Sequence, residues 1–199
     1  MQYNHQFHNQ SPRCESGAGF TMIEMLVVVA IIAILPTIII SNFPKIKLQF
    51  ALSRSAYAFA QDIRRAQDMS LSAMQYQDGE GNIQAISGYG VYLDMNNLGN
   101  KKYIIYADAY PGNHQYDNAL DYIVETLDMS VSEPGVIIKE IKHVFSNTVS
   151  INFSPPNPSI NITSFNEQEH SIDVVFTLED DLSREKIVSI NTAGLIEVK

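Results

Sequence analysis

The chain contains one long apolar run, residues 20–43, which directly follows a polar N-terminal segment. Only six of these 24 residues, among them Glu24 and Pro36, interrupt its apolar character. As a helix rising 1.5 Å per residue, the run would be about 36 Å long, and the hydrocarbon core of a bilayer is about 30 Å thick. The centre of the run is apolar on every helical face, which is unusual for a helix of a soluble protein. We therefore predict a membrane-spanning helix over residues 20–43.

The segment before this run, residues 1–19, is polar throughout and ends at Gly19. In a secretory signal peptide the apolar core precedes the cleavage site and is removed with it. Cleavage after Gly19 would instead leave the apolar helix on a mature chain that begins at Phe20. The single cysteine of the chain, Cys14, lies in this leader, so such a mature chain could form no disulfide.

Beyond Phe43 the pattern becomes amphipathic and predicts that the helix continues within residues 44–77, ending near Gln75. Small and apolar side chains recur every three or four positions on one face: Leu52, Ala56, Phe59, Ile63, Ala66, Ser70 and Ala73. Such a narrow stripe suits a helix that lies on a sheet, and it would make only a weak coiled-coil seam. Pro36 and Pro44 each remove a backbone donor, so we expect a kink or a local break near each.

Residues 78–199 consist of short β-rich runs that are separated by turn residues. We predict strands at 89–93, 103–107, 122–127, 136–141, 149–153, 172–178, 186–190 and 195–198, and turns at 96–102, 111–114, 154–159 and 179–184. The predicted fold is therefore α+β, with a long N-terminal helix followed by an antiparallel, sandwich-like β head.

The formal charge of −9 is unevenly distributed along the chain. Residues 45–69 carry a net charge of +3, whereas residues 70–199 carry −11. An acidic head disfavours nonspecific binding to a phosphate backbone, so we do not expect DNA as a partner.

The segment from Gly19 to Glu24, Gly-Phe-Thr-Met-Ile-Glu, resembles the class III prepilin signal of type IV pilins and type II secretion pseudopilins. The resemblance implies that a prepilin peptidase cuts after Gly19 and methylates the new amino group of Phe20. It also implies that Glu24 takes part in assembling subunits into a filament. A carboxylate at the centre of a membrane costs roughly 2.5–3.5 kcal/mol, and the Phe20 amine of a neighbouring subunit would offset part of this. The alternative is that Glu24 simply reaches the lipid headgroups.

Within this family the distal half is most similar to the H-type minor pseudopilins and related minor pilins, on the segments 59–73, 89–92, 153–156 and 190–196. The resemblance implies a structural subunit, of the minor kind, of a type IV pilus or a type II secretion pseudopilus. It implies four partners: other pilin or pseudopilin subunits, prepilin peptidase, the inner-membrane assembly platform and membrane lipid. The alternatives are a pilus-tip subunit that binds DNA or a surface, and a single-pass anchored adhesin or sensor.

The resemblance also implies a single-pass protein of the cytoplasmic membrane with an exported head, which then joins a periplasmic or extracellular filament. The charges next to the apolar run favour the opposite orientation, since Arg13 precedes the run while Lys45, Lys47 and Arg54 follow it. Processing requires the leader on the inside, and we give the specific junction motif more weight than this charge count.

No zinc-ligand spacing, phosphate-binding glycine loop or nucleophile elbow is present in the sequence, so we expect neither an enzyme nor a bound cofactor. One acidic segment offers oxygen ligands of the kind that calcium prefers: Asp108, Asn113, Asp117 and Asp121. It is similar to the acidic loops of some major pseudopilins, although it lacks the ligand spacing of a strong site. A solvated acidic loop is the alternative.

Overall fold

The computed structural model describes residues 19–155, 159–165 and 167–199. The predicted leader, apart from Gly19, lies outside the described residues. The chain divides into two compact units, Met1–Phe43 and Pro44–Lys199, and each is considered by itself.

A single helix, α1 (Met22–Leu71), runs through the end of the first unit and into the second. It continues without interruption through Pro36 and Pro44, so the expectation of a local break is wrong. Each proline removes one backbone hydrogen bond, and the neighbouring turns still hold the helix together. Close to Pro36, the Thr37 hydroxyl also donates to the carbonyl oxygen of Ala33 at 3.0 Å. A bend at either proline stays a prediction.

The C-terminus of α1 is closed by a Schellman motif, which ends the helix at Leu71 and not near Gln75. The backbone N–H of Met74 donates to the Met69 carbonyl oxygen, and that of Ala73 donates to the Ser70 carbonyl oxygen, both at 3.0 Å. Ala73 has a φ of 47°, in the left-handed region that this motif requires. Its side chain is exposed, so its predicted place on the buried face is wrong.

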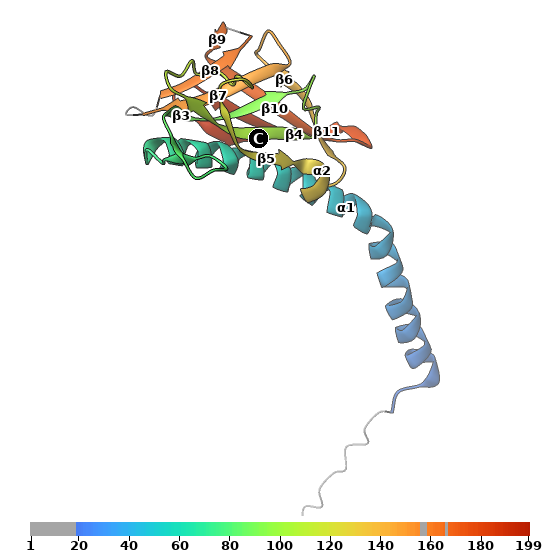
Figure 1. Cartoon of the computed structure of the whole chain (residues 1–199). Helices are drawn as coiled ribbons and strands as arrows, with labels where there is room; N and C mark the ends of the chain where they lie inside the picture. Colours follow the sequence, from blue (N-terminus) through green and yellow to red (C-terminus); the bar gives the residue numbers. More distant parts are fainter. Residues whose placement is uncertain (1–18, 156–158, 166) are drawn as a thin grey trace, which may run out of the picture. The chain divides into compact units, whose positions relative to one another are not determined.

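The strands of the second unit form three antiparallel sheets (Figure 1). A two-stranded ribbon pairs β1 (Tyr76–Gln77) with β2 (Ile83–Gln84). A six-stranded sheet has the order β5-β4-β3-β7-β8-β9, with β3 (Ile86–Asp94), β4 (Lys102–Ala109), β5 (Tyr122–Asp128), β7 (Thr148–Ser154), β8 (Ser159–Ser164) and β9 (Glu167–Glu169). A four-stranded sheet has the order β12-β11-β10-β6, with β6 (Val136–Lys142), β10 (Ser171–Leu178), β11 (Asp181–Asn191) and β12 (Ile196–Val198). A short helix, α2 (Met129–Ser132), follows β5.

One face of the second half of α1 packs against both larger sheets. The ring of Phe59, which is fully buried, lies 5.0 Å from the ring of Tyr103 on β4 and 5.4 Å from that of Phe176 on β10. The buried face repeats the predicted stripe: Leu52, Ala56, Phe59, Ile63, Ala66 and Ser70. Because β4 and β10 belong to different sheets, this one stripe joins the helix to the whole head.

The predicted α+β fold, with a long N-terminal helix packed on antiparallel β-sheets, is confirmed. All eight predicted strands are present, and four short or polar strands were missed, namely β1, β2, β8 and β9. The predicted turn at 179–184 is wrong from Asp181 onward, because β10 and β11 are joined by Glu179 and Asp180 alone. The predicted turn at 154–159 overlaps the ends of β7 and β8, and its residues 156–158 lie outside the described chain.

Candidate processing and assembly site

The predicted cleavage junction lies in accessible, non-helical backbone. Gly19 and Phe20 both precede α1, which begins at Met22. Phe20 is 80% exposed, and a Cβ atom built at Gly19 would meet no described atom within 4 Å other than those of its chain neighbours. A peptidase could therefore reach the bond between these two residues without unfolding the helix.

The first turn of α1 is closed by a capping box formed by Thr21 and Glu24. The backbone N–H of Thr21 donates to Glu24 Oε2 at 2.8 Å, and the Thr21 hydroxyl donates to the same oxygen at 2.9 Å. In return, the backbone N–H of Glu24 donates to Thr21 Oγ1 at 3.2 Å. This reciprocal pairing satisfies donors that would otherwise lack partners at the helix N-terminus. The family resemblance assigns Glu24 to assembly, and the structure adds a local role for the same side chain.

Cleavage after Gly19 would leave this capping box intact, because Thr21 keeps its amide N–H. Both described contacts to the Glu24 carboxylate use Oε2. Among the described residues, Oε1 has no hydrogen-bond partner, so a second donor could approach it from another molecule. The geometry thus allows Glu24 to cap its own helix and to accept a cationic amine at the same time.

The apolar side chains that follow the junction are exposed around the whole helix. In the unit Met1–Phe43, the exposed fractions of the large apolar residues of α1 whose side chains are described range from 47% at Val28 to 94% at Met22. A soluble monomer rarely exposes a contiguous apolar patch of more than a few hundred Å². This half of α1 therefore needs an apolar environment from lipid or from other protein chains.

Comparison with known protein families matches residues 17–39 to the prokaryotic N-terminal methylation motif. The chain carries a class III N-terminal methylation motif. The motif is that of type IV pilins and pseudopilins, and the long helix packed on antiparallel sheets is a pilin-like fold. The match ends before the head, so it concerns processing and the helix and does not resolve the subtype. No significant match was found among curated proteins or among solved structures.

A signal of this class implies a chain that is anchored in the inner membrane and whose head is exported. Among the residues that the structure describes, no helical segment combines the length and the hydropathy needed to cross a membrane. The span over residues 20–43 stays a prediction.

The four residues of the predicted calcium loop surround one cavity of about 360 Å³. Their carboxylates are used by the protein itself: Asp108 accepts from the backbone N–H of His114 at 3.1 Å, and Asp121 accepts from those of Ala109 and Asp117 at 2.9 and 2.7 Å. Burial raises the pKa of both Asp108 and Asp121 above the ordinary value, and the Asp121 charge raises that of Asp108 further. Within the described residues, no three His, Cys, Asp or Glu side chains lie close enough to hold a metal ion. The calcium site stays a prediction.

A second cluster of polar residues, which the sequence did not reveal, covers the outer face of the six-stranded sheet. Ser154 Oγ lies 3.0 Å from His114 Nδ1, and Asp108 Oδ2 lies 3.9 Å from the same nitrogen. In a hydrolytic triad the nucleophile and the orienting carboxylate contact different ring nitrogens of the histidine. Here both face Nδ1, so the cluster lacks the arrangement of a hydrolytic triad. The backbone N–H groups of His114 and Tyr116 donate to Asp108 and Ser150, so the cluster anchors the loop between β4 and β5.

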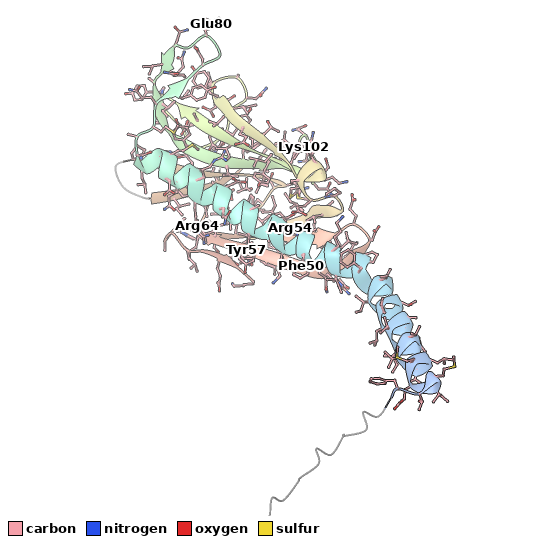
Figure 2. All side chains as sticks on the ribbon, turned by 90° about the horizontal axis from the view of Figure 1, so that it is seen from below. Phe50, Arg54, Tyr57, Arg64, Glu80 and Lys102 are labelled. Atoms are coloured by element: carbon pink, nitrogen blue, oxygen red, sulfur yellow. The ribbon has the colours of Figure 1, made fainter. Side chains whose placement is uncertain are left out.

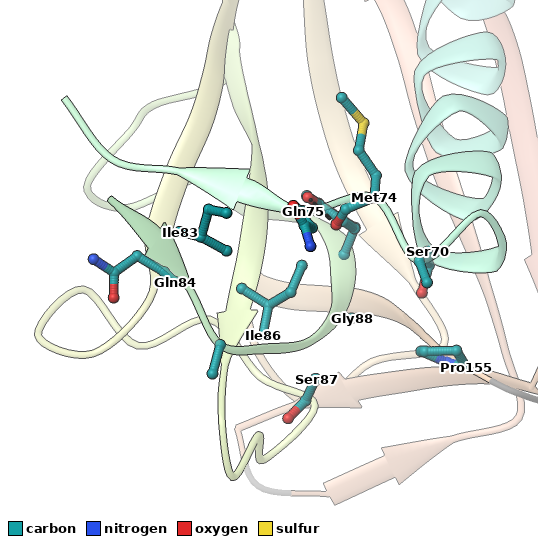
Figure 3. Close-up of a pocket in the computed structure, with 12 residues that line it drawn as sticks. Ser70, Met74, Gln75, Ile83, Gln84, Ile86, Ser87, Gly88 and Pro155 are labelled. Carbon is teal, nitrogen blue, oxygen red and sulfur yellow. Dashed lines mark hydrogen bonds between the residues drawn. The ribbon is translucent and has the colours of Figure 1, made fainter. Parts of the chain in front are cut away.

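Another cavity, of about 410 Å³, lies at the C-terminal end of α1, beside the β1–β2 ribbon (Figure 3). Its walls include Met74, Ile83, Ile86 and Pro155, and none of the described residues in its lining is Asp, Glu, His, Lys or Arg. The Ser70 hydroxyl on its wall donates to the Phe153 carbonyl oxygen at 2.5 Å. The Tyr89 hydroxyl, also in the lining, donates to the Met74 carbonyl oxygen at 2.9 Å, and we take the N-terminal junction as the candidate functional site.

Proposed function

We propose that this chain is a structural subunit of a type IV pilus or a type II secretion pseudopilus. Prepilin peptidase would cut after Gly19 and methylate the amino group of Phe20. The observation that supports this best is an accessible junction placed directly before a capped helix that is apolar on all faces, within the matched methylation motif. The similarity of the distal segments to minor pseudopilins and minor pilins leads us to propose a minor subunit.

Two environments would cover the apolar half of α1 in turn. In the precursor, membrane lipid surrounds residues 20–43, with the head exported. In the filament, the same side chains pack against the helices of other pilin or pseudopilin subunits. The partners are therefore prepilin peptidase, the inner-membrane assembly platform and the other subunits.

Glu24 would have two separate roles in this scheme. Through Oε2 it caps its own helix, as the contacts with Thr21 indicate. Through its charge it would pair with the cationic Phe20 amine of a neighbouring subunit, because a carboxylate without a partner is unfavourable in an apolar filament core. Such a pair would favour one register between adjacent helices.

Two substitutions separate these roles. Glu24→Gln keeps an oxygen that can accept from Thr21 but removes the charge, whereas Thr21→Ala removes the capping hydroxyl and keeps the charge. The measurement is the amount of tagged subunit found in sheared filaments relative to the amount in membranes, in a strain that has the assembly system.

We expect Glu24→Gln to abolish incorporation, while Thr21→Ala lowers it only modestly. The capping contact is typically worth about 1 kcal/mol, which should weaken the first helical turn without removing the charge pair. If Glu24→Gln subunits entered filaments as well as wild type, the assembly role would be wrong. If Thr21→Ala were the more damaging change, helix capping would be the main role of Glu24.

A further inference from the structure

In the unit Pro44–Lys199, the face of α1 that points away from the sheets alternates basic and aromatic side chains. We define this basic-aromatic face by Lys47, Phe50, Arg54, Tyr57, Gln61 and Arg64, which recur every three or four residues and are all exposed. Four of them are labelled along the helix in Figure 2. This spacing places all six on one side of the helix, opposite the stripe that contains Phe59.

The aromatic residues of this face are unusually open to solvent. Phe50 is 61% exposed and Tyr57 is 54% exposed, although both lie on a helix that buries its other face completely. Neither ring contributes to the hydrophobic core of the head. The two rings therefore do not stabilise the head by packing against it.

Two of the three cations of the face, Arg54 and Arg64, contact the head. Arg54 Nε and Nη2 donate to the two carboxylate oxygens of Glu133 at 2.5 and 2.7 Å, and the Arg54 side chain is still 58% exposed. Arg64 Nη2 donates to the carbonyl oxygen of Ile196 at 3.0 Å. The helix residues of the face supply three cations and no acid, but Glu133 of the head neutralises Arg54, so among the described residues the unpaired positive charge of the face lies at Lys47 and Arg64. Residues 70–199, in contrast, carry a net charge of −11.

We propose that this basic-aromatic face rests on an anionic lipid surface while the subunit is anchored in the membrane. Aromatic rings mixed with Lys and Arg are typical of segments that lie at the headgroup level. The face begins a few residues after Phe43, the end of the predicted span, so it starts close to the bilayer, and the bend predicted at Pro44 would turn it along the surface. Anionic lipid repels the acidic remainder of the head, so the basic-aromatic face is the side of the head that approaches the bilayer. The inference rests on the membrane-anchored precursor of the proposed function.

The acidic surface of a second copy is a less suitable occupant. Eight carboxylates of the head pair with Lys or Arg side chains of the same chain: Glu125, Asp128, Glu133, Glu140, Glu179, Asp181, Glu185 and Glu197. At these eight positions a neighbouring head would have to exchange one ion pair for another to engage the face, whereas lipid phosphates are available without that exchange.

The test uses the full chain in phosphatidylcholine vesicles with or without phosphatidylglycerol. Cys14 is the single cysteine, so a Cys14→Ser background allows one fluorescent reporter to be placed at a chosen site. Gln61→Cys places an environment-sensitive dye on the face. Gln168→Cys places the same dye on β9, which lies across the head from α1 (Figure 1), and it serves as the matched control.

We expect the Gln61→Cys reporter to show a blue shift and quenching by headgroup-labelled nitroxide lipid in phosphatidylglycerol vesicles only. High salt should reverse this response, because mobile ions screen the attraction between exposed charges. The double substitution Lys47→Gln and Arg64→Gln should also remove it, with the near-ultraviolet circular dichroism of the head unchanged. The Gln168→Cys reporter should not respond in any vesicle.

Equal signals in both vesicle types, or an equal response from the two reporters, would overturn the proposal. A response that grows with the ratio of protein to lipid, together with energy transfer between labelled chains, would assign the face to a second copy and also overturn it. If the chain did not float with vesicles of either kind, the membrane-anchored precursor of the proposed function would itself be contradicted. This outcome is therefore distinct from those that overturn only the lipid contact of the basic-aromatic face.

Discussion

Ala73 occupies a position that favours glycine, and replacing it should stabilise the head. Its φ of 47° lies in the left-handed region, where an L side chain costs roughly 1–2 kcal/mol. Ala73→Gly removes this strain but makes the unfolded chain more flexible, which costs about 0.4–1 kcal/mol. The Ala73 side chain is exposed, so little packing is lost. We expect a net increase of about 0.5–1 kcal/mol in the free energy of unfolding, from the difference between these two effects.

The same substitution at Ala58 is a matched control. Ala58 is also exposed on α1, but it lies within the helix, where glycine is less favourable than alanine by about 1 kcal/mol. Urea unfolding of the full chain in detergent micelles can follow tyrosine fluorescence, since the chain has ten tyrosines and no tryptophan. Ala73→Gly should raise the midpoint and Ala58→Gly should lower it, with equal slopes. If both substitutions lowered the urea midpoint equally, the left-handed conformation assigned to Ala73 at the end of α1 would be wrong.

Two further substitutions test the core and the buried acid of the head. Phe59→Ala should lower the free energy of unfolding by about 3–5 kcal/mol, because it removes the fully buried ring that contacts both sheets, and urea titration measures this loss. Burial raises the folded-state pKa of Asp108 above 3.8, so its stabilising contribution is present at acid pH and is lost as the pH rises through that raised pKa. The stability of Asp108→Asn relative to wild type should therefore increase from acid to neutral pH, which thermal melts of the two proteins at each pH would measure. A difference in stability that does not depend on pH would show that the pKa of Asp108 is not raised.

The sequence predicted the parts of the fold that depend on regular apolar spacing. The buried stripe from Leu52 to Ser70 was found because a helix on a sheet repeats every three or four residues, and the eight main strands were found from β-branched and aromatic runs. The end of α1 was missed because Ala73 gives no glycine signal for the left-handed turn. β8 was missed because its inward side chains, Ile160 and Ile162, alternate with polar ones next to a proline-rich segment.

The candidate site was predictable only in part. Gly19, Phe20 and Glu24 follow from a local motif, and local motifs can be recognised without tertiary structure. The capping pair of Thr21 and Glu24 could have been predicted from its Thr-x-x-Glu spacing. The contact between His114 and Ser154 could not, because it joins residues 40 positions apart through a loop that folds over the sheet.

The central claim is that the bond between Gly19 and Phe20 converts an anchored precursor into a filament subunit. The most direct measurement is mass spectrometry of the N-terminal peptide of the full chain, expressed with active or inactive prepilin peptidase. With the active enzyme we predict a chain that begins at Phe20 and carries a methyl group on its amine, and with the inactive enzyme residues 1–19 should be retained. An intact leader in the presence of the active peptidase would contradict the filament-subunit function and favour a single-pass anchored adhesin or sensor.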